Sequence, residues 1–129
     1  MRYVIIAARL LLGLMFVIFG SNLVLLFLPP PPRIPGNAGA FSSAMFTSHF
    51  VYLVSAAQVI PGALLIVNQY VPLALVVLAA VIVNIWAFHI TMWPQAIVPF
   101  PILVTICWFI VAWPLRAHFA PLLARKVEV

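Results

Sequence analysis

The sequence from Ile34 to Leu115 contains no Asp, Glu, Lys or Arg, which leaves 82 consecutive residues without a formal charge. Globular domains carry about 25% charged residues, whereas this chain of 129 residues is 5% charged and 67% hydrophobic. A mean hydropathy of +1.30 is typical of a chain that lies mostly within a bilayer. The sequence therefore predicts a small integral membrane protein, with one membrane domain over residues 1–129 and the lipid bilayer as its main partner.

The same composition excludes several classes of function. The single cysteine, Cys107, excludes an internal disulfide, and the single acidic residue, Glu128, excludes hydrolysis by paired carboxylates. No glycine-rich nucleotide motif is present. The six Lys and Arg residues do not cluster on a soluble module, so the pI of 10.4 predicts no nucleic-acid partner. Any chemistry must use histidines, amides and hydroxyls, and no residue is an evident catalytic nucleophile.

Four segments are long and apolar enough to cross about 30 Å of hydrocarbon. We expect membrane helices at about residues 3–28, 44–67, 71–93 and 97–119, with a proline-rich outer loop over residues 29–43. Short connections make consecutive helices antiparallel neighbours, so the prediction is an all-α, up-down-up-down four-helix bundle. Gly13 and Gly20, on the first helix, are interpreted as positions where two helices pack closely.

The basic residues predict the orientation of the spans. Five of the six flank one side of the predicted membrane region, namely Arg2, Arg9, Arg116, Arg125 and Lys126. Only Arg33 lies on the other side. Because cytoplasmic loops carry an excess of Lys and Arg, both termini are predicted to be cytoplasmic. The expected location is the bacterial cytoplasmic (inner) membrane, crossed several times.

Polar side chains inside the spans are the candidates for a ligand site, because they are costly in lipid. They are Asn22, His49, Gln58, Asn84 and His89. At 1.5 Å per residue, the two histidines and Asn22 lie roughly 6–9 Å below the outer surface, Asn84 about 14 Å and Gln58 about 20 Å. Helical spacing separates Asn84 from His89 by about 140° and His49 from Gln58 by about 180°. Only an interior touched by three or four helices would gather all five side chains, and we expect the amides and imidazoles to face such an interior.

Several interpretations of these residues stay open. His89 together with Asn84 or Gln58 could hydrogen-bond the carbonyl groups of a quinone, an apolar ring that needs only one or two polar contacts. His49 and His89, at equal depth on two helices, could instead be axial ligands of a haem iron. In the simplest interpretation, histidines near the boundary reach the headgroups and the amides hydrogen-bond between helices.

Three runs of residues resemble the DoxX family of small membrane proteins: Gln58–Leu65, Asn68–Leu75 and Val81–His89. The first helix, from Arg9 to Ser21, is similar to that family as well. The resemblance implies a four-helix bundle and an association with quinone-linked redox chemistry, with other membrane redox subunits as partners. It also implies that Asn84 and His89 are the characteristic polar pair. Gln58 stands where many members have Glu, and Asn22 lies near where many have Lys.

The leading expectation is therefore an accessory component of a quinone-linked membrane redox system. The alternatives are a structural subunit or assembly factor of a larger membrane complex, a homo-oligomer without chemistry of its own, and a small-molecule permease.

Overall fold

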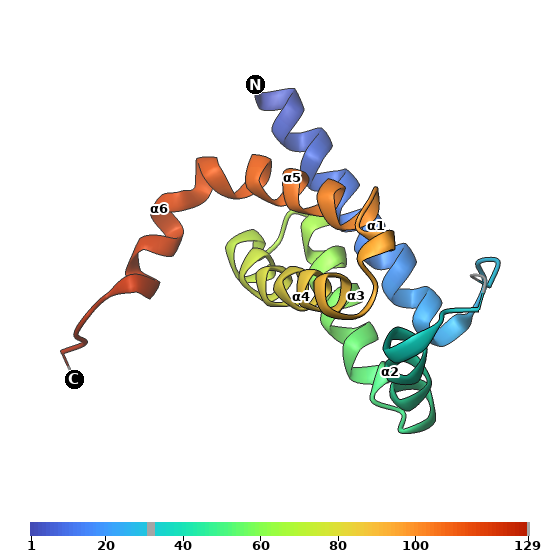
Figure 1. Cartoon of the computed structure of the whole chain (residues 1–129). Coiled ribbons are helices and arrows are strands. Elements are labelled where there is room, and N and C mark those ends of the chain that lie inside the picture. The colour runs from blue at the N-terminus through green and yellow to red at the C-terminus, as the bar shows by residue number, and fades with distance from the viewer. Residues whose placement is uncertain (31–32, 129) are drawn as a thin grey trace.

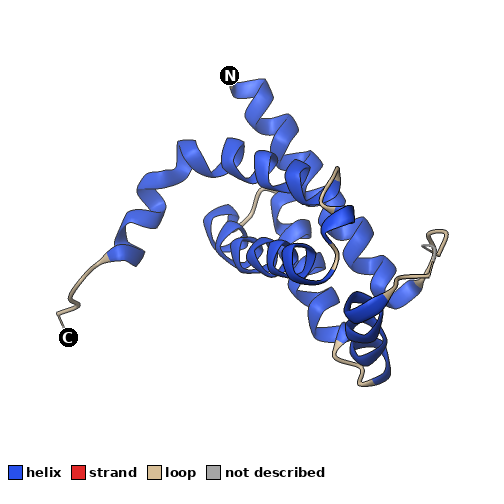
Figure 2. Ribbon diagram, in the orientation of Figure 1, coloured by secondary structure: helices blue, strands red, loops and turns tan. Residues whose placement is uncertain are grey.

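A computed structural model describes residues 1–30 and 33–128, and every regular element in this part of the chain is helical. In chain order the elements are α1 (Arg2–Leu25), α2 (Gly36–Thr47), α3 (Val51–Ile66), α4 (Val71–Met92), η1 (Pro94–Ala96), α5 (Phe100–Ala112), η2 (Trp113–Leu115), α6 (Arg116–Phe119) and η3 (Ala120–Leu123), where η marks a 3-10 helix (Figure 1, Figure 2). The predicted all-α class is confirmed for the described residues.

Three helical stretches are each long and apolar enough to cross a membrane: α1, α4 and the stretch Phe100–Leu123. The helices α2 and α3 pass the same test only as a pair, and they meet at a bend of 88°. The described chain thus has three candidate spans, or four if the bent pair counts as one span. These helices support the prediction of a membrane protein.

The prediction of one helix over residues 44–67 is wrong, because the chain turns sharply after Thr47. The Thr47 hydroxyl donates to the carbonyl oxygen four residues earlier at 2.8 Å, and Ser48 Oγ accepts from the Phe50 N–H at 3.3 Å. Hydroxyls that bond to the nearby backbone compete with helical hydrogen bonds. His49 lies between the two helices with a φ of 64°, in the left-handed region. The polar turn therefore ends α2 and begins α3 in a new direction.

Much of the predicted outer loop, residues 29–43, is also helical, because α2 begins at Gly36. Ala38 is fully buried, and the Phe41 ring packs against Phe88 of α4 with 5.5 Å between ring centroids. Positions three residues apart share one face of a helix. Packing of this face against α4 offsets the weak helix propensity of the neighbouring glycines and serines.

The remaining predicted helices agree better with the structure. The third matches α4 to within one residue. The first ends at Leu25, a few residues early, because Leu26 takes a left-handed conformation with a φ of 52°. The last was expected over residues 97–119, but α5 begins only at Phe100. Pro114, which has no backbone N–H, then falls in η2 between α5 and α6.

The most extensive helix–helix contact is between α1 and α3, and three glycines allow the close approach. A Cβ atom added to Gly13 would lie 2.7 Å from the Gly62 carbonyl oxygen, and one added to Gly62 would lie 2.9 Å from the Gly13 carbonyl oxygen. Gly20 lies equally close to α3, since an added Cβ would be 2.8 Å from Cβ of Gln58. The predicted close-packing role of Gly13 and Gly20 is confirmed.

The core joins four helices. Its large, fully buried side chains come from α1, α3, α4 and α5: Leu12, Phe16, Leu65, Leu75, Leu78, Val104 and Val111. Two indole N–H groups tie α4 to α5: Trp86 Nε1 donates to Thr105 Oγ1 at 2.8 Å, and Trp108 Nε1 donates to the Leu75 carbonyl oxygen at 2.9 Å. In Figure 1, α2 lies at one end of α3, and the C-terminal tail beyond α6 extends away from the other helices.

Candidate functional site

His89 lies in the last turn of α4 and is partly buried. Its Nδ1 atom is 2.7 Å from the carbonyl oxygen of Ile85. Because a carbonyl oxygen can only accept, Nδ1 carries the proton of the neutral ring and Nε2 keeps a lone pair. The imidazole meets the Phe88 ring edge-on at 5.2 Å, and it is nearly parallel to the Trp93 ring, with 12° between planes and 6.3 Å between centroids. His89 thus combines one acceptor nitrogen with an aromatic surrounding.

Asn84 lies in the middle of α4 on an exposed face. Its Nδ2 atom donates to the carbonyl oxygen of Ala80, one turn earlier, at 2.8 Å. The expectation that this amide points into the bundle interior is wrong, because the face of α4 that packs on the core contains Leu75, Leu78 and Ile82 instead. Asn84 is therefore presented to whatever surrounds the single chain.

Gln58 is partly buried in the contact between α1 and α3, where its Cβ packs against Gly20. On the same interface the buried Ser55 hydroxyl donates to the Gly20 carbonyl oxygen at 2.8 Å. This polar link between two helices is of the kind that holds membrane helices together. Gln58 and Ser55 thus belong to the packing of α3 on α1.

Asn22 and His49 both lie at helix ends. Asn22 Oδ1 accepts a hydrogen bond from the Leu28 N–H at 2.8 Å, which fixes the turn that follows α1. His49 is exposed in the turn between α2 and α3, and its ring lies 5.8 Å from the Tyr52 ring. The hydrogen bond to the backbone of Leu28 therefore explains the position of Asn22. The 88° bend between α2 and α3 explains the position of His49.

The five predicted site residues do not form one pocket. Asn84 and His49 are exposed, Gln58 lies between α1 and α3, and the two histidines contact different aromatic rings. A haem held between His49 and His89 gains no support from this arrangement. Within residues 1–30 and 33–128, no group of three or more His, Cys, Asp or Glu side chains could hold a metal ion.

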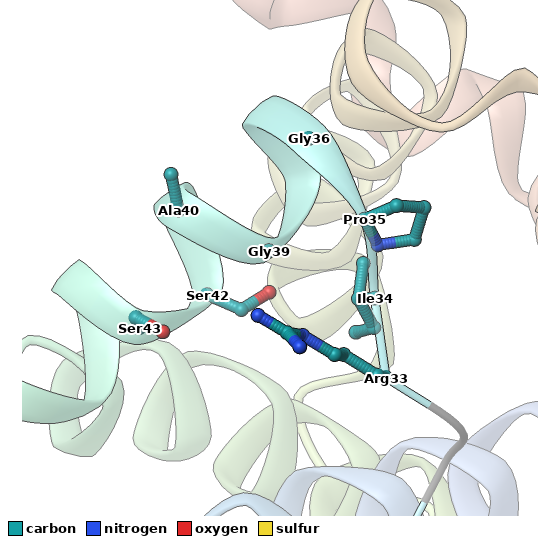
Figure 3. Close-up of a pocket in the computed structure, with 8 residues that line it drawn as sticks. All are labelled: Arg33, Ile34, Pro35, Gly36, Gly39, Ala40, Ser42 and Ser43. Carbon is teal, nitrogen blue, oxygen red and sulfur yellow. The ribbon is translucent and has the colours of Figure 1, made fainter.

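One hollow of about 660 Å³ lies at the start of α2, between Arg33 and the first turns of that helix. Figure 3 shows the Arg33 side chain extending along the hollow toward Ser42 and Ser43. Gly39 lets the chain fold back here, because a Cβ atom at this position would clash with the Ile34 carbonyl oxygen. None of the five predicted site residues lines this hollow.

A second hollow of about 600 Å³ lies where the start of α1, the turn between α3 and α4, and the end of α5 meet. We call it the basic pocket, and its polar lining is Arg2, Arg9, Asn68 and His118. Sequence analysis used Arg9 only to predict the orientation of the spans and did not single out His118. The signal for a pocket was the spacing of Arg2 and Arg9, because residues seven apart share one face of a helix.

The fold and these sites define a small helical membrane protein in which several polar side chains join helices to one another, and Asn22, His49, Asn84 and His89 lie near helix ends or on an exposed face. Comparison of the chain with family models, with curated proteins and with solved structures finds no match. The resemblance to the DoxX family therefore rests on the sequence runs that contain Gln58, Asn84 and His89.

Proposed function

We propose that this chain is a membrane-embedded accessory protein of a quinone-linked redox system, in which His89 contacts the quinone headgroup. The observation that carries the proposal is the hydrogen bond between His89 Nδ1 and the Ile85 carbonyl oxygen, at 2.7 Å. It leaves Nε2 as a lone-pair acceptor for a quinol hydroxyl. The resemblance to the DoxX family, which implies quinone-linked chemistry, supports the same assignment.

The surroundings of His89 suit a planar, lipid-soluble ring. The rings of Phe88 and Trp93 both lie next to the His89 imidazole, at 5.2 and 6.3 Å between ring centroids. Ligand sites for such rings are mostly apolar and aromatic, with few polar groups that fix orientation. Asn84, on the exposed surface of the same helix, offers a further amide toward the lipid.

The proposal includes a topology. We place the protein in the bacterial cytoplasmic membrane, with four crossings and cytoplasmic termini, and we count the bent pair α2–α3 as one crossing. The support is the distribution of basic residues, since five of six flank one side.

Fusions to alkaline phosphatase test this topology, because that enzyme folds to its active form only after export from the cytoplasm. We expect a fusion at the C-terminus of the full chain to be inactive. The matched control is a fusion after Gln95, in the turn between α4 and α5, which should be active. The opposite pattern of activity would refute the proposed orientation, and two active fusions would refute a fourth crossing.

Extraction of the purified protein tests the quinone contact. We expect wild-type protein to retain quinone and His89→Ala to retain about tenfold less, because a hydrogen bond to a buried polar headgroup contributes about 1–1.5 kcal/mol. The matched control is His49→Ala, which removes an exposed imidazole from the turn between α2 and α3. Quinone-free wild-type protein, or equal loss in both variants, would refute the proposal.

A second candidate is a structural subunit that assembles through α4, favoured by the exposed position of Asn84. One exposed face of this helix has residues every three or four positions: Leu73, Val77, Ala80, Asn84, Ala87 and Thr91. Small residues allow helices to approach closely in lipid, and an amide can hydrogen-bond across the contact. If the protein assembles through α4, Asn84→Leu should convert an oligomer to a monomer in native electrophoresis. If α4 contacts only lipid and quinone, the same variant should leave the oligomeric state unchanged.

A further inference from the structure

We infer that the basic pocket binds the phosphate group of an anionic phospholipid. The pocket is formed by segments far apart in the sequence, and its volume of about 600 Å³ leaves room for a headgroup. This inference is independent of the proposed contact between His89 and quinone, because His89 does not line the pocket.

Two arginines of α1, Arg2 and Arg9, line the basic pocket. Arg2, Ile5, Ile6 and Arg9 all line the pocket, and their spacing puts them on one face of α1. The Cα atoms of the two arginines are therefore about 10 Å apart along the helix axis. His118, from α6, lines the same pocket. Three basic side chains thus converge from the two ends of the chain.

The positive charge of the basic pocket is not balanced by its own lining residues. No residue that lines the pocket is acidic, and Glu128 is the only acidic residue in the sequence. Arg9 donates from Nη1 to the Leu65 carbonyl oxygen near the end of α3, and a guanidinium group has four further N–H donors. Arginine matches the geometry of phosphate with two parallel hydrogen bonds. The counter-charge for this pocket must come from outside the protein, and a phosphate fits the donors.

The depth and the apolar wall of the basic pocket favour a phospholipid over a free phosphate ion. The pocket lies at the start of two membrane-length helices, α1 and α4, which is the depth of the headgroups if both cross the bilayer. Much of its remaining wall is apolar and includes Ile5, Val71, Val111 and Leu115. A free ion gains nothing from such a wall, whereas the glycerol and first acyl carbons of a lipid do. Basic pockets between membrane helices bind anionic headgroups in this way.

Native mass spectrometry of the full chain in detergent tests the inference, with phosphatidylglycerol and phosphatidylcholine titrated separately. We expect the wild type to retain one phosphatidylglycerol at least tenfold more tightly than phosphatidylcholine. Arg2→Gln should remove most of this preference, since a charge-assisted hydrogen bond is roughly twice as strong as a neutral one. The matched control is Arg33→Gln, which removes a guanidinium from the hollow at α2 and should leave the preference unchanged.

Arg9 is left unchanged in these variants, because it also bonds to the end of α3 and its replacement would disturb the fold. As a second variant, His118→Gln removes an exposed imidazole from the pocket lining and should weaken the preference by a smaller factor. Equal binding of the two lipids by the wild type would overturn the inference. So would equal effects of Arg2→Gln and Arg33→Gln. Displacement of the bound lipid by millimolar inorganic phosphate would overturn the lipid assignment and identify a phosphate ion site instead.

Discussion

Replacement of Gly13 by alanine should separate α1 from α3. The added Cβ would lie 2.7 Å from the Gly62 carbonyl oxygen, well short of the 3.4 Å at which ordinary contacts begin. That oxygen belongs to the backbone and cannot rotate away, so the helices themselves must move. Such overpacking costs about 1–3 kcal/mol, and the better helix propensity of alanine returns at most about 1 kcal/mol. We expect a net loss of about 1–2 kcal/mol in the free energy of unfolding.

The assay is reversible unfolding in mixed micelles of mild detergent and SDS, followed by tryptophan fluorescence. Ala7→Leu is the matched control, because it enlarges an exposed residue on the same helix and should leave the midpoint unchanged. A Cβ atom at either Gly13 or Gly62 would clash with the backbone of the other residue. Once Gly13→Ala has moved the helices apart, adding Gly62→Ala should therefore lower the free energy of unfolding by less than Gly62→Ala does alone. A Gly13→Ala variant as stable as the wild type would refute the close contact between α1 and α3.

Three further predictions use the same unfolding assay or a thiol label. Ser55→Ala should lower the free energy of unfolding by about 0.6 kcal/mol, the average for a hydrogen bond between membrane helices, because it removes the 2.8 Å link to Gly20. Asn22→Ala should cost about 1 kcal/mol by removing the acceptor for the Leu28 N–H, and Asn22→Asp should restore most of the loss, whereas equal losses would contradict this role. Cys107 is only 4% exposed, so maleimide should label it in SDS but not in the folded protein, and rapid labelling of the folded chain would contradict its burial.

Much of the membrane character could be predicted from the sequence, because hydropathy sums over many residues and tolerates local errors. The match of α4 to its predicted range and the role of Gly13 both follow from this kind of regular pattern. The break after Thr47 could not be predicted in the same way. Residues of these types also occur inside apolar helices, and only the hydrogen bonds of Thr47 and Ser48 to the nearby backbone mark the end of α2.

The candidate site was harder to predict, because periodicity gives the angle between two side chains but not which angle faces a neighbouring helix. The spacing predicted about 140° between Asn84 and His89, but it could not show that the core of α4 lies on the side of Leu75 and Ile82. Arg9 illustrates the same limit. Its side chain could reach either headgroups or protein, and the Leu65 carbonyl oxygen that it contacts lies 56 residues away in sequence.

The hydrogen bonds of the polar side chains indicate where this protein meets other molecules. Asn84, Thr91 and Thr105 each donate to a carbonyl oxygen four residues earlier in their own helix. Side chains that are occupied in this way have less capacity to bind a ligand. Groups that keep spare capacity are His89 Nε2, the side-chain carbonyl oxygen of Asn84 and the guanidinium groups of the basic pocket. Because the chain carries a net charge of +5, it cannot neutralise these arginines itself. The proposed contacts with quinone and with phospholipid would both lie at the lipid boundary, where anionic headgroups and apolar rings are available.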